Sequence, residues 1–130
     1  MQRYAAIDIG SNAIRMLFEQ VYEKPEGPVF KKLTLVRLPV RLGEDAFIKG
    51  KISKKKEKHL MSMAKSFKHL CAIFEVIDYR ATATSAMRDS KNGMDIIAKI
   101  EEETGVHIEI IKGEEEAKIL YESVFNTGKI

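Results

Sequence analysis

The sequence has one cysteine, no apolar run of membrane-spanning length and no low-complexity segment. The single cysteine, Cys71, excludes a disulfide framework, and its apolar helical surroundings indicate a small core residue. The apolar run near the N-terminus is interrupted at Asp8 and is too short for the core of a signal peptide. We therefore expect a cytoplasmic protein with no membrane partner.

The length and composition fit one packed domain. The chain has 130 residues, of which 45% are hydrophobic, and this content is enough for a single core. The three histidines share no ligand spacing with one another or with the cysteine, so the sequence predicts no zinc site.

Positive charge is concentrated in one segment, although the formal net charge is only +3. The lysines of this segment are Lys49, Lys51, Lys54, Lys55, Lys56 and Lys58. They are either the solvated start of a helix or a contact for a polyanion. Because cations oppose the dipole at a helix N-terminus, we do not expect them to stabilise the helix, which favours a role outside folding. The segment contains no aromatic residue on which a base could stack, so we expect no specific nucleic-acid partner.

Hydrophobic periodicity predicts strands and helices in the order βββαβαβα. The predicted strands are 4–7, 13–18, 29–41, 76–83 and 108–111, and the predicted helices are 53–74, 92–104 and a third that begins near 113. Ser53 and Asn92 suit helix N-caps, and Gly105 suits a C-cap. Crossover helices make the later strands parallel, whereas the first three form an antiparallel meander. The expected fold is a mixed α/β sheet of five strands with flanking helices.

A glycine turn between the first two predicted strands carries the first candidate site. Asp8 could hold Mg²⁺ or its water shell, because hard cations prefer oxygen ligands. Gly10 leaves the backbone open to a ligand, and Ser11 and Asn12 add short hydrogen-bonding groups. The same residues also suit an ordinary hairpin turn.

Two later loops follow predicted strands and carry further candidate residues. Arg88, in the small-residue loop 84–92, could clamp phosphate oxygens with its planar fork or could pair with Asp89. Glu116 belongs to a group of three glutamates that suits the start of a helix, but crowded carboxylates also raise the pKa of at least one member toward that of a general base. Because ligands bind beyond the carboxyl ends of strands in such sheets, the three loops could converge on one cleft.

Five short motifs follow one another along the chain. They are Asp8-Ile9-Gly10-Ser11-Asn12 with Arg15, Arg41-Leu42-Gly43, Ala83-Thr84-Ser85-Ala86-Met87-Arg88 with Asn92, Thr104-Gly105-Val106, and Gly113-Glu114-Glu115-Glu116-Ala117. In this order and spacing the chain resembles the exopolyphosphatase and guanosine pentaphosphate phosphatase family over nearly its whole length. The resemblance implies the ribonuclease H-like half shared with actin, sugar kinases and heat-shock chaperone ATPases. It also implies Mg²⁺-dependent hydrolysis of a terminal phosphoanhydride in polyphosphate or guanosine pentaphosphate.

The resemblance also implies roles for single residues. A glutamate matching Glu116 is the catalytic base that activates water in the family, and Asp8 is the expected Mg²⁺ ligand. The residues expected to bind phosphate are Gly10, Ser11, Asn12, Arg15 and Arg88. Phosphoryl transfer needs an oriented nucleophile and neutralised charge more than covalent help, which agrees with this set.

The family carries a second phosphate loop, Asp-x-Gly-Gly-Gly-Ser-x-Glu, in a following domain, and this sequence contains none. Residues 1–130 are therefore expected to be the N-terminal domain of a longer phosphatase and to hydrolyse little alone. An open sheet edge would allow a homodimer. Two alternatives remain: a nucleotide-binding phosphotransferase of the same superfamily, or a non-catalytic polyanion-binding module.

Overall fold

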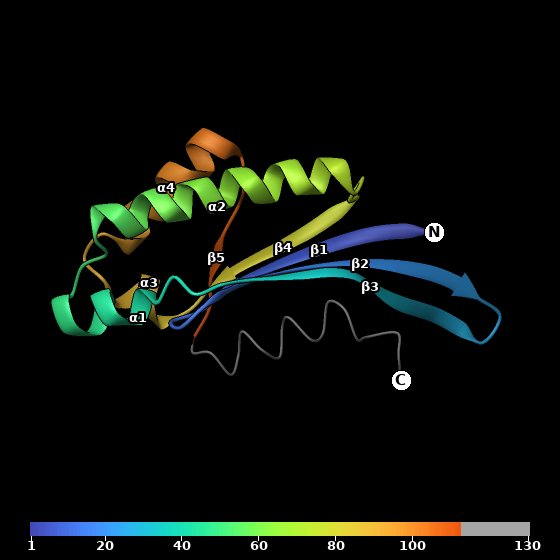
Figure 1. Cartoon of the computed structure of the whole chain (residues 1–130), viewed down its shortest axis with the longest axis horizontal. Coiled ribbons are helices and arrows are strands. Elements are labelled where there is room, and N and C mark those ends of the chain that lie inside the picture. Colours follow the sequence, from blue (N-terminus) through green and yellow to red (C-terminus); the bar gives the residue numbers. More distant parts are fainter. Residues whose placement is uncertain (113–130) are drawn as a thin grey trace.

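The structure is a computed structural model that describes residues 1–112. Its centre is a five-stranded sheet in the order β3-β2-β1-β4-β5 (Figure 1). The strands are β1 (Gln2–Ile9), β2 (Ile14–Lys24), β3 (Gly27–Leu38), β4 (Asp78–Ala83) and β5 (Glu109–Ile110). The helical elements are α1 (Leu42–Glu44), a π-helical turn η1 (Asp45–Lys49), α2 (Lys54–Ile73), α3 (Ser85–Asp89) and α4 (Gly93–Thr104).

The strand directions confirm the predicted mixed sheet. β1 pairs antiparallel with β2, and β2 pairs antiparallel with β3. β4 is parallel to both β1 and β5, as the intervening helices require. The β2–β3 hairpin extends past the other strands, and α2 and α4 lie together over one face of the sheet (Figure 1).

Side chains along β1 alternate between the helix-covered core and the opposite face of the sheet. Ile7 and Ile9 point into the large core beneath the helices, where Phe18 stacks against Phe67 with ring centroids 5.8 Å apart. Asp8 lies between the two isoleucines and therefore faces the opposite side of the sheet. The helices thus bury the apolar half of β1 and leave the carboxylate on the other face.

The three predicted helix caps are confirmed in position. The Ser53 side chain accepts a hydrogen bond from the Lys56 backbone N–H at 3.3 Å, and Gly105 ends α4 with φ of 78°. Asn92 is the N-cap residue of α4 as predicted, but its side chain accepts no hydrogen bond from a helix N–H. It instead bonds both the backbone N–H and the carbonyl of Ile52, each at 2.9 Å.

Short helical segments appear where the sequence predicted none. α1 and η1 lie between β3 and α2, and α3 occupies part of the predicted loop 84–92. These segments are too short to show a helical period, and buried side chains such as Leu42 and Met87 hold them in place. At Gly93 a Cβ would lie 1.8 Å from the Met87 carbonyl oxygen, so only glycine allows α4 to begin so close to α3.

The remaining boundaries differ by up to six residues, and the largest difference is at the second strand, which ends at Lys24 and not at Phe18. The third strand ends at Leu38 and not at Arg41, and the fourth begins at Asp78 and not at Val76. The helix predicted to begin near 113 lies outside the described residues. Within residues 1–112, no helix is long and apolar enough to cross a membrane.

Candidate functional site

A pocket of about 280 Å³ lies at the carboxyl end of β1. Its lining residues are Asp8, Gly10, Ser11, Asn12, Ala13, Arg15 and Arg37. The structure therefore brings together the predicted residues of the first motif. A larger groove of about 670 Å³ lies between α2 and β3, but apolar side chains dominate its lining and it contains none of the predicted site residues. Polar groups that converge on one point make the smaller pocket the better candidate for an anion site.

The glycine turn is tight because its backbone closes on itself. The Gly10 N–H donates to the Ala13 carbonyl oxygen at 3.1 Å. A Cβ on Gly10 would lie only 3.0 Å from that same oxygen. The missing side chain at position 10 therefore makes room for the turn itself, and the turn carries Ser11 and Asn12 into the pocket wall.

Asp8 and Arg15 form the charged floor of the pocket. They are register partners on β1 and β2, and the Arg15 guanidinium donates to Asp8 Oδ2 at 2.6 Å. Asp8 is 4% exposed. Its other oxygen, Oδ1, is buried and has no hydrogen-bond partner among the residues that the structure describes. A buried carboxylate oxygen without a partner loses free energy unless a ligand or water meets it, so Oδ1 is available to a bound group.

The residues present fit Mg²⁺ held jointly with a phosphate. Residues 1–112 contain no group of three or more histidine, cysteine or acidic side chains that could hold a metal alone. Mg²⁺ is commonly bound through one or two carboxylates, waters and substrate phosphate oxygens. Asp8 Oδ1 could supply such a carboxylate, because it is buried and has no hydrogen-bond partner among the described residues.

The Arg41–Gly43 segment supports the glycine turn from behind. The Gly43 N–H donates to the Ser11 carbonyl at 2.8 Å, and the Arg41 N–H donates to the Asn12 carbonyl at 3.0 Å. A Cβ on Gly43 would lie 3.2 Å from the Ser11 Cβ, which is tighter than side chains normally approach. Gly43 therefore allows close packing of this segment against the turn.

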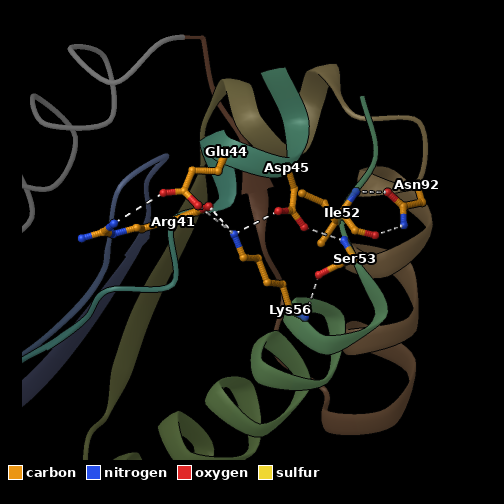
Figure 2. Close-up of polar contacts among 7 residues, drawn as sticks. All are labelled: Arg41, Glu44, Asp45, Ile52, Ser53, Lys56 and Asn92. Carbon is orange, nitrogen blue, oxygen red and sulfur yellow. Dashed lines mark hydrogen bonds and ion pairs between the residues drawn. The ribbon is translucent and has the colours of Figure 1, made fainter. Parts of the chain in front are cut away.

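A buried ion pair anchors that segment to α2 (Figure 2). Lys56 Nζ lies 3.0 Å from Asp45 Oδ1 and donates to the Arg41 carbonyl at 2.7 Å. Asp45 Oδ2 accepts the Ser53 backbone N–H at 2.7 Å. Burial alone would raise the pKa of Asp45, but the hydrogen bonds from Ser53 and Lys56 outweigh it and hold the pKa below the usual 3.8.

This ion pair corrects one expectation about the lysine segment. Lys56 does have a role in folding, because it joins the N-terminus of α2 to the Arg41–Gly43 segment. The helix dipole disfavours a cation at this position. The buried carboxylate of Asp45, 11 positions earlier, attracts Lys56 more strongly than the dipole repels it. Charge patterning indicated the lysines, but only the folded loop places Asp45 beside one of them.

The Ala83–Arg88 motif lies next to the glycine turn. The Thr84 backbone N–H donates to the Ile9 carbonyl at 3.3 Å, so α3 begins beside the end of β1. Arg88 lies on α3, where its Nε pairs with Asp89 Oδ1 at 3.1 Å, and it is not among the residues that line the 280 Å³ pocket. The phosphate role of Arg88 therefore stays a prediction.

In sequence, the Gly113–Ala117 motif follows β5, the next strand along the sheet. The Ile111 N–H donates to the Ala83 carbonyl at 2.9 Å, which places the end of β5 beside the end of β4. The carboxyl ends of β1, β4 and β5 thus lie side by side, as the convergence of loops requires. Glu116 lies outside the described residues, so its role as base stays a prediction.

Arg37 is a pocket residue that sequence reasoning missed. It lies on β3 directly opposite Arg15 in the register and lines the same pocket. No motif indicates it, because its place depends on how β3 pairs with β2. The alternation of side chains along β3 could have indicated Arg37 only if the β2–β3 register had been known.

A family model and curated relatives place the chain in one family. The sequence profile of the Ppx/GppA phosphatase family matches residues 20–129. Exopolyphosphatase 1 of Mycobacterium tuberculosis is 29% identical over 122 residues, which cover 94% of this chain and 35% of that protein. The chain thus spans about a third of the length of this curated relative.

Solved structures show the same likeness. A Ppx/GppA family member from Aquifex aeolicus matches with a TM-score of 0.82 at 26% identity, covering 95% of this chain and 39% of that chain. An exopolyphosphatase from Cytophaga hutchinsonii matches with a TM-score of 0.79 at 27% identity, covering 95% of this chain and 38% of that chain. The fold is the ribonuclease H-like half that the family resemblance implies.

Proposed function

The chain belongs to the Ppx/GppA phosphatase family, and from that premise we propose that it provides the phosphate- and Mg²⁺-binding side of a phosphoanhydride hydrolase. The observation that carries the proposal is the pocket at the glycine turn. There a buried carboxylate oxygen without a described partner lies in a pocket that two arginines, Arg15 and Arg37, also line. This combination suits an anion bound together with a divalent cation, and neither an ordinary hairpin nor a packing site needs it.

The proposed chemistry follows from the charges in the pocket. The transferred phosphoryl group spreads negative charge over its oxygens, and catalysis depends on holding and neutralising that charge. The glycine turn would present Ser11 and Asn12 to the terminal phosphate, and Arg15 would donate its planar fork to it. Bound Mg²⁺ would neutralise charge on the phosphate oxygens beside Asp8. Glu116 would take a proton from the attacking water.

The proposed substrate is inorganic polyphosphate, with guanosine pentaphosphate as the alternative. The names of the relatives from M. tuberculosis and C. hutchinsonii support polyphosphate, and the family description supports both. We also propose a cytoplasmic location, which the single cysteine supports.

A longer chain is part of the proposal. The second glycine-rich phosphate loop of the family does not occur in these 130 residues, and the chain covers 35% of the M. tuberculosis relative. We propose that the 130-residue chain alone hydrolyses little. A robust rate of phosphate release by the purified 130-residue chain with Mg²⁺ and polyphosphate would contradict this point.

The test of the function is a Glu116→Gln substitution in the natural protein that contains this sequence. Loss of a general base lowers turnover by about 10²–10⁴-fold, so phosphate release should fall by that factor while polyphosphate binding persists. Glu26→Gln, at an exposed turn, is the matched control and should leave the rate unchanged. An unchanged rate of hydrolysis in Glu116→Gln would contradict the role of Glu116 as the base. Phosphate transfer to an acceptor other than water would favour the phosphotransferase alternative.

A further inference from the structure

Arg37 belongs to a row of charged residues that crosses three strands. Asp8 on β1 is the register partner of Arg15 on β2, and Arg15 is the register partner of Arg37 on β3. Residues directly opposite one another in a sheet share a face, so the three side chains occupy one face. All three line the same pocket.

The row carries more positive than negative charge. Asp8 is committed to Arg15 at 2.6 Å, and no ion pair or side-chain hydrogen bond involves Arg37 within residues 1–112. Like charges directly opposite one another destabilise a sheet unless an anion lies between them. Arg15 keeps 40% of its side chain exposed, so an anion can reach it.

We infer that Arg37 binds the phosphoryl group next to the one held at the glycine turn. The substrate chain would then run from the turn, over Arg15, toward β3. Paired residues on neighbouring antiparallel strands have Cα atoms roughly 4.5–5.5 Å apart, which allows two guanidinium groups to meet successive groups of a linear polyanion. This inference rests on the proposed function and deepens it, because it gives the pocket a preference for linked phosphates over a single phosphate.

The alternative is that Arg37 is an exposed arginine with no ligand. Its charge would then act on any anion through the general field of the surface, as the charge of another exposed cation on the strand would. Lys31 provides the comparison, because it is an exposed cation on the same strand and does not line the pocket. Arg37→Gln and Lys31→Gln change the net charge equally.

The experiment is calorimetric titration of the protein, in the presence of Mg²⁺, with tripolyphosphate and separately with orthophosphate. Arg37→Gln should weaken tripolyphosphate binding by about 5–10-fold, the size expected for one partly exposed charge-assisted contact. Orthophosphate affinity should change by less than about twofold, and Lys31→Gln should match the wild type with both probes. Arg37→Lys should recover part of the loss, because it keeps the charge without the planar fork.

The contrary results are distinct. If Arg37→Gln binds tripolyphosphate as tightly as the wild type, or loses no more than Lys31→Gln, the assignment of Arg37 is wrong and the proposed function stands. Equal loss for both probes would place Arg37 at the terminal phosphate and overturn the direction of the chain. If the wild type binds neither probe, the inference fails together with the proposed phosphate pocket.

Discussion

Replacing Asp45 with asparagine tests the buried ion pair that holds the Arg41–Gly43 segment. Asparagine keeps the shape and an oxygen for the Ser53 N–H, but it removes the charge that faces Lys56. Asp45 is 4% exposed and the Lys56 side chain is 19% exposed, so water can replace the lost carboxylate only in part. Within residues 1–112, the Glu44 carboxylate also lies near Lys56 Nζ, at 3.9 Å.

The expected loss follows from these contacts. Breaking a buried ion pair costs about 3–5 kcal/mol when both charges are fully enclosed, and losing a hydrogen bond to a charged group costs about 1.5–3 kcal/mol. Because the Lys56 side chain stays partly exposed to water, we expect Asp45→Asn to lower the free energy of unfolding by about 2–3 kcal/mol. At roughly 4 °C per kcal/mol for a chain of this size, Tm should fall by about 8–12 °C.

The pH dependence has a definite sign. The pKa of Asp45 is lower in the folded protein than the usual 3.8, so its stabilisation is present above the unfolded pKa and is lost as pH falls through the folded pKa. The gap between wild type and Asp45→Asn should therefore be full near pH 7 and should shrink below about pH 4. A gap that stays constant down to about pH 3 would contradict this account.

Thermal unfolding followed by circular dichroism measures these quantities. Glu44→Gln is the matched control. The Glu44 carboxylate also lies near Lys56 but is 57% exposed, so its loss should lower the free energy of unfolding by less than about 1 kcal/mol. A double-mutant cycle with Lys56→Met should show a coupling of about 1–3 kcal/mol between Asp45 and Lys56. Equal destabilisation by Glu44→Gln, or no coupling in the cycle, would refute the reasoning.

Three further predictions concern packing and reactivity. Phe67→Ala should lower the free energy of unfolding, measured in urea, by about 3–5 kcal/mol. Phe47 is 59% exposed, so Phe47→Ala should change it by less than about 0.5 kcal/mol. Similar losses in the two variants would contradict the assigned core. Gly93→Ala should lower the free energy of unfolding by about 1–3 kcal/mol or more, because the added Cβ would meet a backbone oxygen, and an unchanged urea midpoint would refute this close contact. Burial raises the pKa of Cys71 to about 11, so iodoacetamide should alkylate the folded protein roughly 100-fold more slowly than free cysteine near neutral pH; fast reaction would show that the thiol is accessible.

Local patterns predicted the long elements well. The apolar stripe of α2 and the cap at Ser53 lie within one continuous segment, so their spacing alone carries the information. The same is true of the glycine turn, since the strands on either side are adjacent in sequence and pair directly. Asp8 could therefore be placed at the turn from local pattern, and the family resemblance added Arg15 to the same site.

Features that depend on distant partners could not be predicted in this way. Asn92 bonds Ile52, 40 residues earlier, and such a choice leaves no mark on local spacing. Arg37 reaches the pocket only in the observed β2–β3 register, which shifts at an irregularity between Phe18 and Glu19. A different register would place the arginine on the other face.

The most direct test of the central claim is the rate of phosphate release from polyphosphate as a function of Mg²⁺ concentration. It would be measured in the natural protein that contains this sequence, for the wild type and for Asp8→Asn, with Glu26→Gln as control. The account predicts that the rate rises with Mg²⁺ and saturates in the wild type and the control, and that it falls to background in Asp8→Asn while the protein stays folded. A folded Asp8→Asn protein with the wild-type rate and Mg²⁺ dependence would contradict the account.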